Sequence, residues 1–287
     1  MCAGLDIGAD RIRLAVLRRQ RDRLRLELLA DYAFGQTICN DGQIGDFELL
    51  VRGCRQLLRQ YTIHAGPVAM SIPAAAVTLT QLTLPAASNQ LERLAQVRAE
   101  VAAYRQQPLD ELALDYRVLG PAPRSPADVQ VLAATTPAML VEDRLALAES
   151  LGLKARTVVP DGWSLATFLR GSDCAAVLHL GAASAGLSLH AQSWQPLAWR
   201  PGSSPITDLL GELAPMLQPA PQRLLLSGDA VDLNPVAAAL RKYAGIPAAI
   251  AAFPPRILMA NHAAAAIAPR NLPAFHCAVA LAAEGLM

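Results

Sequence analysis

The first residues whose types and spacing could do chemistry are Asp6 and Gly8, in the opening stretch CAGLDIGADRIRLAVL (residues 2–17). An apolar strand pattern precedes the acid, and a second strand pattern follows the glycine. A glycine turn lets backbone N–H groups approach an anion, and a carboxylate beside it can hold the water shell of Mg²⁺. The stretch therefore fits either a phosphate-binding hairpin or an ordinary turn between two strands.

A second stretch, CAAVLHLGAASAGLSLH (residues 174–190), repeats this layout of strand, glycine turn and strand. His179 stands where Asp6 stands in the first stretch, and Gly181 stands where Gly8 does. A third strand, QPLAWRP, follows, and further along the stretch LSGDA holds Ser227 and Gly228. The internal echo predicts two halves of similar topology, a layout that resembles the actin, Hsp70 and sugar kinase superfamily. That resemblance implies glycine hairpins that face each other across a cleft and bind phosphates from both sides.

The elements around the first hairpin define the fold class that we expect. Three strand patterns, the third with a bulge-like irregularity, precede a helix over GDFELLVRGCRQLLRQY with Asp46 available as its N-cap, and the strand PVAMSIP follows. This β-β-β-α-β order is the core of an RNase H-like domain.

After Pro73 the pattern changes to an alternating strand, AVTLTQLTLP. Alternation places Val77, Leu79, Gln81 and Thr83 on one face of that strand. A helix capped by Ser88, the strands LALDYRVLG and DVQVLAATT, and a helix over residues 137–151 complete a compact α+β module, inserted into the first half.

Composition bounds the classes of protein. The chain has 287 residues, of which 53% are hydrophobic, but Pro, Arg or Asp repeatedly interrupts the apolar stretches. We expect no membrane span, no signal peptide and a cytoplasmic location. The five cysteines are odd in number and lack a C-x-x-C pair, which argues against a disulfide framework and a zinc knuckle. No metal-ligand spacing is found among the remaining histidines, which are His64, His190, His262 and His276.

Net charge is +1, so there is no global electrostatic case for a nucleic-acid partner. Seven arginines nevertheless crowd the region between Arg11 and Arg25. Two hypotheses fit this cluster: a solvated face of a strand pair, or attraction to anionic lipid. Ser71 and Ser227 have no partners that the sequence can place beside them, so we predict no catalytic nucleophile.

Several segments, taken in order, resemble the PilM family of type IV pilus assembly proteins, which are actin-like and related to FtsA. They are GLDIGADRIRLAVL, VAMSIPAAAVTLTQLTLP, RLAQVRAEVAAYRQQPLDELALDYRVLG, VVPDGWSLATFL, RLLLSGDA and FHCAVALAAEGLM. The resemblance implies an α/β, actin-like fold of two RNase H-like subdomains with an inserted α+β subdomain of the 1C type. We expect the first subdomain over 1–72, 153–172 and a C-terminal helix 273–287, the insertion over 73–152, and the second subdomain over 173–272.

The resemblance also implies a nucleotide site, with departures. Its vestigial residues would be Asp6, Gly8, Arg13, Gly181, Ser227 and Gly228. His179 replaces the second hairpin's acid, and Ala9, Asp10 and Arg11 replace small hydroxyl residues. Between the third strand of the second half and LSGDA, the chain is too short for the base-binding subdomain of nucleotide-binding relatives. We therefore expect a pseudo-ATPase with no required cofactor and at most weak binding of ATP and Mg²⁺; an ATP-binding actin-like ATPase is the alternative.

For a partner, the resemblance implies the N-terminal cytoplasmic peptide of a PilN-like inner-membrane protein, together with further pilus platform proteins. PilM relatives hold that peptide in a groove between the first subdomain and the inserted one. In this chain the strand with Val77, Leu79, Gln81 and Thr83 would border the groove. We expect a scaffold of a type IV pilus, competence or secretion complex at the inner face of the inner membrane, attached peripherally through its partner.

Overall fold

The computed structural model describes residues 1–63, 65–104, 108–165, 168, 175–181, 185–189, 193–199, 204–218, 220–264 and 267–287. The chain forms two compact units: unit 1 comprises Met1–Ala74 and Arg144–Met287, and unit 2 comprises Ala75–Asp143. In the described part of the chain, no helix is both long and apolar enough to cross a membrane. His64, His190 and the expected boundary at residues 172 and 173 lie outside the described residues.

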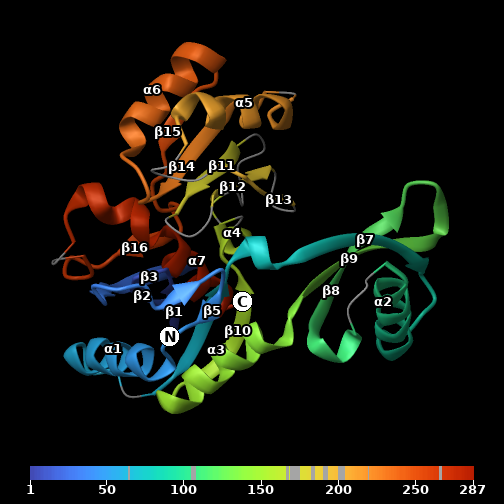
Figure 1. Cartoon of the computed structure of the whole chain (residues 1–287), viewed down its shortest axis with the longest axis horizontal. Helices are drawn as coiled ribbons and strands as arrows, with labels where there is room; N and C mark the ends of the chain where they lie inside the picture. Colours follow the sequence, from blue (N-terminus) through green and yellow to red (C-terminus); the bar gives the residue numbers. More distant parts are fainter. Residues whose placement is uncertain are drawn as a thin grey trace. The chain divides into compact units, whose positions relative to one another are not determined.

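Unit 1 contains a six-stranded sheet in the order β10-β6-β1-β2-β3-β16 (Figure 1). Strands β1, β2 and β3 form antiparallel pairs, and β6, β10 and β16 pair in parallel with their neighbours. The strands are β1 (Cys2–Ile7), β2 (Arg11–Gln20), β3 (Arg23–Ala33), β6 (Pro67–Ile72), β10 (Lys154–Pro160) and β16 (Ile257–Met259), and a two-stranded ribbon of β4 (Cys39–Asn40) and β5 (Gln43–Ile44) accompanies them. The predicted irregularity is confirmed: the β2–β3 register shifts beside Val16, at the level of Glu27.

The second sheet of unit 1 has the order β13-β12-β11-β14-β15. Its strands are β11 (Ala175–Leu180), β12 (Ala185–Leu189), β13 (Ser193–Pro196), β14 (Arg223–Gly228) and β15 (Ala248–Ile250). This order matches β10-β6-β1-β2-β3 of the first sheet read from the other end, with β11 in the place of β1. The internal echo in the sequence therefore corresponds to two halves of one topology.

Each of the two sheets has helices on both of its faces. Helix α1 (Phe47–Gln60) begins at the predicted cap, where the Asp46 side chain accepts a hydrogen bond from Leu49 N–H, and it packs on the β1 face that carries Leu5. Helices α5 (Ile206–Met216) and α6 (Leu233–Ala244) pack on the β11 face that carries Leu178. The inner faces meet the short helix α4 (Asp161–Ser164) and helix α7 (His276–Glu284) (Figure 1).

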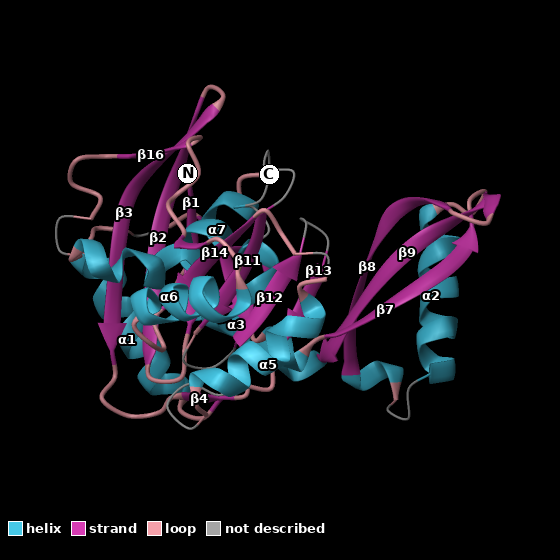
Figure 2. Ribbon diagram, turned by 90° about the horizontal axis from the view of Figure 1, so that it is seen from above, coloured by secondary structure: helices cyan, strands magenta, loops and turns pink. Residues whose placement is uncertain are grey.

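Unit 2 is a three-stranded antiparallel sheet, β7-β9-β8, with one helix packed on it (Figure 2). Its elements are β7 (Thr78–Pro85), α2 (Gln90–Tyr104), β8 (Leu112–Ala122) and β9 (Ser125–Pro137). Leu82 and Leu84 of β7 pack with Val97 and Val101 of α2 in one apolar cluster. The predicted cap Ser88 is wrong by one residue: Asn89 accepts from the N–H groups of Leu91 and Glu92, because Glu92 completes a capping box with it.

Two segments differ from the expected boundaries. Unit 2 ends at Asp143, within helix α3 (Ala138–Ser150). The rest of this helix belongs to unit 1, because Leu147 and Ala148 are buried in the core of the first sheet. Residues 257–272 were expected in the second half, but β16 pairs with β3 of the first sheet. Ala260 N–H donates to the carbonyl of Leu26, and Leu29 N–H donates to that of Ala263, so this segment covers the β3 edge.

Replacing Gly4 by Ala should destabilise unit 1 strongly. A Cβ on Gly4 would lie 2.0 Å from the Ala278 carbonyl oxygen and 2.5 Å from the Ala282 nitrogen, both backbone atoms of α7. Because backbone cannot move aside cheaply, we expect a loss of about 3 kcal/mol in the free energy of unfolding.

The matched control is Gly211→Ala in α5, where no atom beyond the chain neighbours and the nearby backbone of the helix itself lies within 4 Å of the position that a Cβ would take. This change should be neutral or stabilise by up to about 1 kcal/mol, because Ala has the higher helix propensity. Urea unfolding followed by circular dichroism measures both variants. Equal stability of the two would contradict the close packing of α7 on β1.

Candidate functional site

The inner faces of the two sheets bring four of the predicted polar positions to one region. On β1 and β2, Asp6 and Arg13 are cross-strand partners on the face opposite Leu5 and Leu14. On β11 and β14, His179 and Ser227 are partners in the parallel register, opposite the apolar face. Strand alternation thus turns these side chains toward α7 and the space between the sheets.

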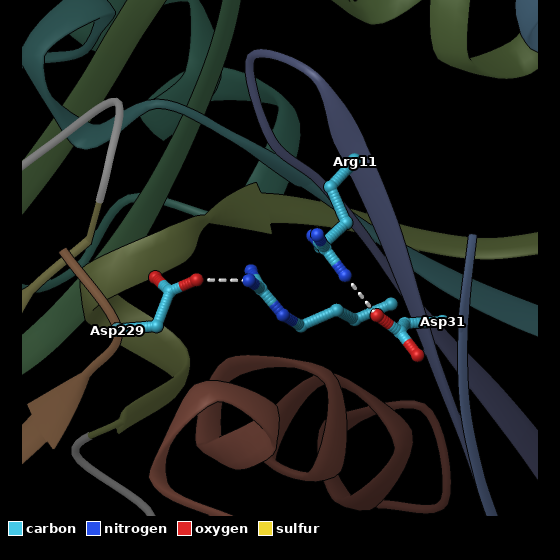
Figure 3. Close-up of polar contacts among 4 residues, drawn as sticks. Arg11, Asp31 and Asp229 are labelled. Carbon is cyan, nitrogen blue, oxygen red and sulfur yellow. Dashed lines mark hydrogen bonds and ion pairs between the residues drawn. The ribbon is translucent and has the colours of Figure 1, made fainter. Parts of the chain in front are cut away.

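Two ion pairs lie at the mouth of this region (Figure 3). Arg13 of the first sheet binds the carboxylate of Asp229, which follows β14 of the second sheet, and Arg11 binds Asp31 on β3. The Arg13 and Asp229 side chains are only 12% and 29% exposed. A cavity of about 700 Å³ adjoins the pairs, lined by residues of both halves that include Arg11, Arg13, Gly228, Asp229, Asn234 and Arg270.

Asp6 lies at the end of β1, where a hydroxyl group of the same sheet contacts it. Ser71 Oγ donates to Asp6 Oδ1 at 2.9 Å and accepts from Ile7 N–H at 3.4 Å. Burial raises the pKa of the Asp6 carboxyl, while the Arg13 charge lowers it and nearby Asp161 raises it further. The first sheet therefore holds a desolvated acid whose nearest compensating charge is Arg13.

A buried hydrogen-bonded chain joins the second sheet to α7. Ser227 Oγ lies 3.2 Å from Nδ1 of His179 and 3.1 Å from Nδ1 of His276. One hydroxyl hydrogen can serve only one of these nitrogens, so at least one imidazole carries its proton on Nδ1. Burial lowers the pKa of His179 and lowers that of His276 to about 3, so both rings are neutral at physiological pH.

At the glycine turns, backbone N–H groups donate hydrogen bonds to carbonyl groups of the chain itself. Gly8 N–H donates to the Arg11 carbonyl at 2.8 Å and closes the first hairpin. Gly228 adopts a φ of +106°, and a Cβ there would lie 2.3 Å from the Leu180 carbonyl oxygen, so only glycine fits. The N–H groups of Asp229 and Ala230 both donate to that same carbonyl, at 3.1 and 3.0 Å. Residues 182–184 of the second hairpin lie outside the described residues.

Some groups at this site cannot be found by sequence motif alone. Asp161 accepts from the N–H groups of Ala74 and Gly162, at 3.0 and 2.6 Å, and lies close enough to Asp6 to raise its pKa. The sequence feature that could have indicated Asp161 is its position directly after a strand, in VVPDGW, but the same position also fits an ordinary turn. His276 looked like a solitary histidine, because Ser227 is 49 residues away from it.

The predicted site residues divide between the two units. Asp6, Arg13, Ser227 and Gly228 lie at the region between the sheets, and Gly181 is buried directly after β11. Val77 and the β7 residues Leu79, Gln81 and Thr83 belong to unit 2. In the part of the chain that the structure describes, no group of three or more His, Cys, Asp or Glu side chains could hold a metal ion.

Two RNase H-like halves of one topology, with polar strand ends facing a shared cavity, define an actin-like protein. Solved structures agree with this class. The "PilM-PilN type IV pilus biogenesis complex" matches with a TM-score of 0.78 at 20% identity, covering 100% of this chain and 98% of that chain. The ethanolamine utilization protein EutJ from Carboxydothermus hydrogenoformans matches with a TM-score of 0.55 at 11% identity, covering 98% and 88%.

The cytoplasmic domain of EpsL, an inner-membrane component of the type II secretion system of Vibrio cholerae, also matches, with a TM-score of 0.54 at 11% identity over 99% and 94% of the two chains. The family model described as "Type IV pilus assembly protein PilM" matches residues 4–169, more than half of the chain. The chain belongs to the PilM family, as the sequence motifs predicted.

The ion pair between Arg13 and Asp229 should stabilise the contact between the two halves. In a double-mutant cycle with Arg13→Ala and Asp229→Ala, we expect a coupling free energy of about 1 kcal/mol or more, because both side chains are largely shielded from water. The matched control is the Glu48–Arg52 pair on α1, whose side chains are 88% and 63% exposed. Its coupling should stay below about 0.5 kcal/mol. Urea unfolding measures both cycles; equal couplings would contradict a special role of the Arg13 pair.

Stability should also fall in acid because of the buried histidines. The folded state keeps His276 neutral down to about pH 3, whereas the unfolded chain takes up a proton below its ordinary pKa of 6.5. Unfolding therefore becomes easier as pH falls through this window, by up to about 1.4 kcal/mol per pH unit for one group. Asp6 acts in the opposite sense, because its raised pKa favours the fold at low pH.

The difference between wild type and His276→Gln isolates the histidine. Urea unfolding at several pH values between about 8 and 5 should give a smaller slope for the variant, although Gln lowers its stability at neutral pH. An unchanged slope would show that His276 titrates normally in the fold.

Proposed function

We propose that this chain is a scaffold of a type IV pilus assembly complex, which holds the N-terminal cytoplasmic peptide of a PilN-like inner-membrane protein. We place it at the cytoplasmic face of the inner membrane, beside further pilus platform proteins. Family membership and the likeness to a PilM–PilN complex support this role. The observation that carries it is the position of β7 at an edge of the sheet in unit 2.

Strand β7 offers an extended peptide both kinds of contact that strand addition requires. Among the described residues it pairs on one side only, with β9, so its other edge keeps free N–H and C=O groups. Gln81 and Thr83 are exposed and Leu79 is partly buried, while Leu82 and Leu84 point into the core of unit 2. A peptide paired along this edge would gain main-chain hydrogen bonds, with side-chain selectivity from the outward residues.

Charged replacements on β7 should weaken the peptide. We expect the PilN-like N-terminal peptide to bind the wild-type chain with a dissociation constant in the micromolar range or tighter. Gln81→Arg or Leu79→Arg should weaken binding at least about tenfold, a cost of about 1.4 kcal/mol. The matched control is Val118→Arg on β8, the opposite edge strand, where Val118 is 41% exposed. Fluorescence anisotropy of a labelled peptide measures each; equal affinity of all variants would exclude β7 as the docking edge.

The same proposal includes loss of ATP turnover. A hard cation such as Mg²⁺ prefers oxygen ligands, and His179 offers a neutral ring whose Nδ1 already contacts Ser227. The N–H groups of Asp229 and Ala230 are engaged by Leu180, and the Asp229 carboxylate adds negative charge beside the loop. Phosphoryl transfer depends on positioned donors and metal charge, which these residues do not supply.

Calorimetry with ATP and Mg²⁺ tests this part. We expect no hydrolysis above buffer background and no binding tighter than about the millimolar range, equivalent to about 4 kcal/mol. A micromolar dissociation constant would favour the ATP-binding alternative. The double variant His179→Asp/Asp229→Gly serves as the reference, because it restores an acid and removes the intruding carboxylate; stronger binding by this variant alone would locate the defect at these two residues.

A further inference from the structure

The turn between β2 and β3 carries a concentrated positive charge. Figure 2 shows this turn projecting from the first sheet. Five arginines lie on it and beside it, with Asp22 and Glu27 as the acids of the segment, which gives residues 18–27 a net charge of +3 in a chain of net charge +1. The arginines are Arg18, Arg19, Arg21, Arg23 and Arg25.

Internal contacts leave most of this charge available. Glu27 is shared by Arg18 at 3.3 Å and Arg25 at 3.7 Å, and those arginine side chains remain 61% and 43% exposed. Arg19 donates to the backbone carbonyl of Leu286, a neutral acceptor. Arg21 and Arg23 are exposed, and no carboxylate in the described part of the chain pairs with either.

The backbone of the turn places Arg21 in an uncommon conformation. Arg21 has a φ of +53°, the left-handed region in which Gly and Asn are favoured over residues with a long side chain. Gln20 and Arg23 are paired, so Arg21 and Asp22 form the two-residue loop. An arginine at this position keeps a charge at the outermost point of the hairpin at the expense of an easier turn.

Apolar side chains accompany the charge. Strand β16 pairs with β3 beside the turn, with Leu258 opposite Arg25, and its Leu258 and Met259 are 41% and 44% exposed. A shallow hollow of about 420 Å³ lies there, lined by Gln20, Arg25, Leu258, Met259, Ala260, Asn261 and His262. The amphipathic helices that lie at the boundary between phospholipid headgroups and acyl chains also combine basic side chains with apolar ones, so this combination fits a membrane surface.

We propose that this basic rim, defined as the five arginines with Leu258 and Met259, binds an anionic phospholipid surface directly. Charge alone would equally suit a nucleic acid, but the described residues that line the hollow include no Phe, Tyr or Trp to stack on a base. Exposed Leu and Met gain nothing from phosphates in water, whereas a bilayer buries them. The rim lies in unit 1 and β7 in unit 2, so lipid binding does not depend on the proposed peptide.

Co-sedimentation of the full chain with vesicles tests the proposal. The chain should bind vesicles in which about a third of the lipid is phosphatidylglycerol and should not bind pure phosphatidylcholine, since the gain comes from the anionic surface. Arg21→Gly/Arg23→Gln should bind about 25-fold more weakly at low ionic strength, because each arginine contributes roughly fivefold. Glycine relieves the left-handed turn, so this variant keeps the fold. Leu258→Ser/Met259→Ser should lose the part of binding that survives high salt.

The matched control is Arg241→Gln/Lys242→Gln at the end of α6, which removes the same charge from exposed positions elsewhere in unit 1. It should bind anionic vesicles like the wild type. Equal weakening in both charge variants would overturn the rim as the site. The proposal would also fail if a DNA or RNA duplex bound as tightly as the vesicles, or if inorganic phosphate displaced the chain more effectively than chloride at equal ionic strength.

Discussion

The contact between α7 and β1 determines how the two halves of unit 1 are joined. The helix backbone lies so close to β1 that only a residue without a side chain fits at Gly4, and the small residues Ala278 and Ala282 complete the contact. At this depth α7 also reaches the second half, where His276 contacts Ser227 and Ala280 packs with Val177. One buried helix thereby ties both sheets together (Figure 1).

That tie has an electrostatic consequence, because a helix buried between two sheets desolvates the polar groups beside it. The pKa of Asp6 rises and those of His179 and His276 fall for this shared reason. Arg13 and Asp229 supply the compensating charges and join the two sheets at the cavity mouth. At the cavity mouth the Arg13 guanidinium is therefore paired with a carboxylate that the chain itself supplies (Figure 3).

Local patterns in the sequence predicted most of the elements and their class. The period of the apolar residues identified α1, and the Asp46 cap needs only a contact three residues along the chain. The echo around His179 predicted two similar sheets, because strand order within each half follows short connections. Alternation correctly separated Leu82 and Leu84 from Gln81 and Thr83 in β7.

Contacts between residues far apart in the sequence could not be predicted from the sequence alone. Arg13 and Asp229 are 216 residues apart in the sequence. Arg13 was expected to contact a nucleotide, and its positive charge fits a phosphate as well as it fits the Asp229 carboxylate. Strand β16 has only three residues, too few for a periodic signal, so its pairing with β3 depends on burial of Ile257, Ala260 and Ala263 and not on any pattern in its own sequence. Asn89 and Ser88 are both good caps, and only the position of Glu92 decides between them.

The internal pairing between the halves bears on how such a scaffold works. A protein held together by nucleotide gains stability in proportion to the logarithm of nucleotide concentration and loses it when the ligand leaves. In unit 1 the Arg13–Asp229 pair, the Ser227 hydrogen bonds and the α7 packing come from the chain itself. Their contribution does not vary with the supply of ATP. None of the residues of the β7 edge or of the basic rim lines the cavity. If the proposed scaffold role is correct, contacts that the chain supplies itself would hold the two halves together whether or not nucleotide is bound.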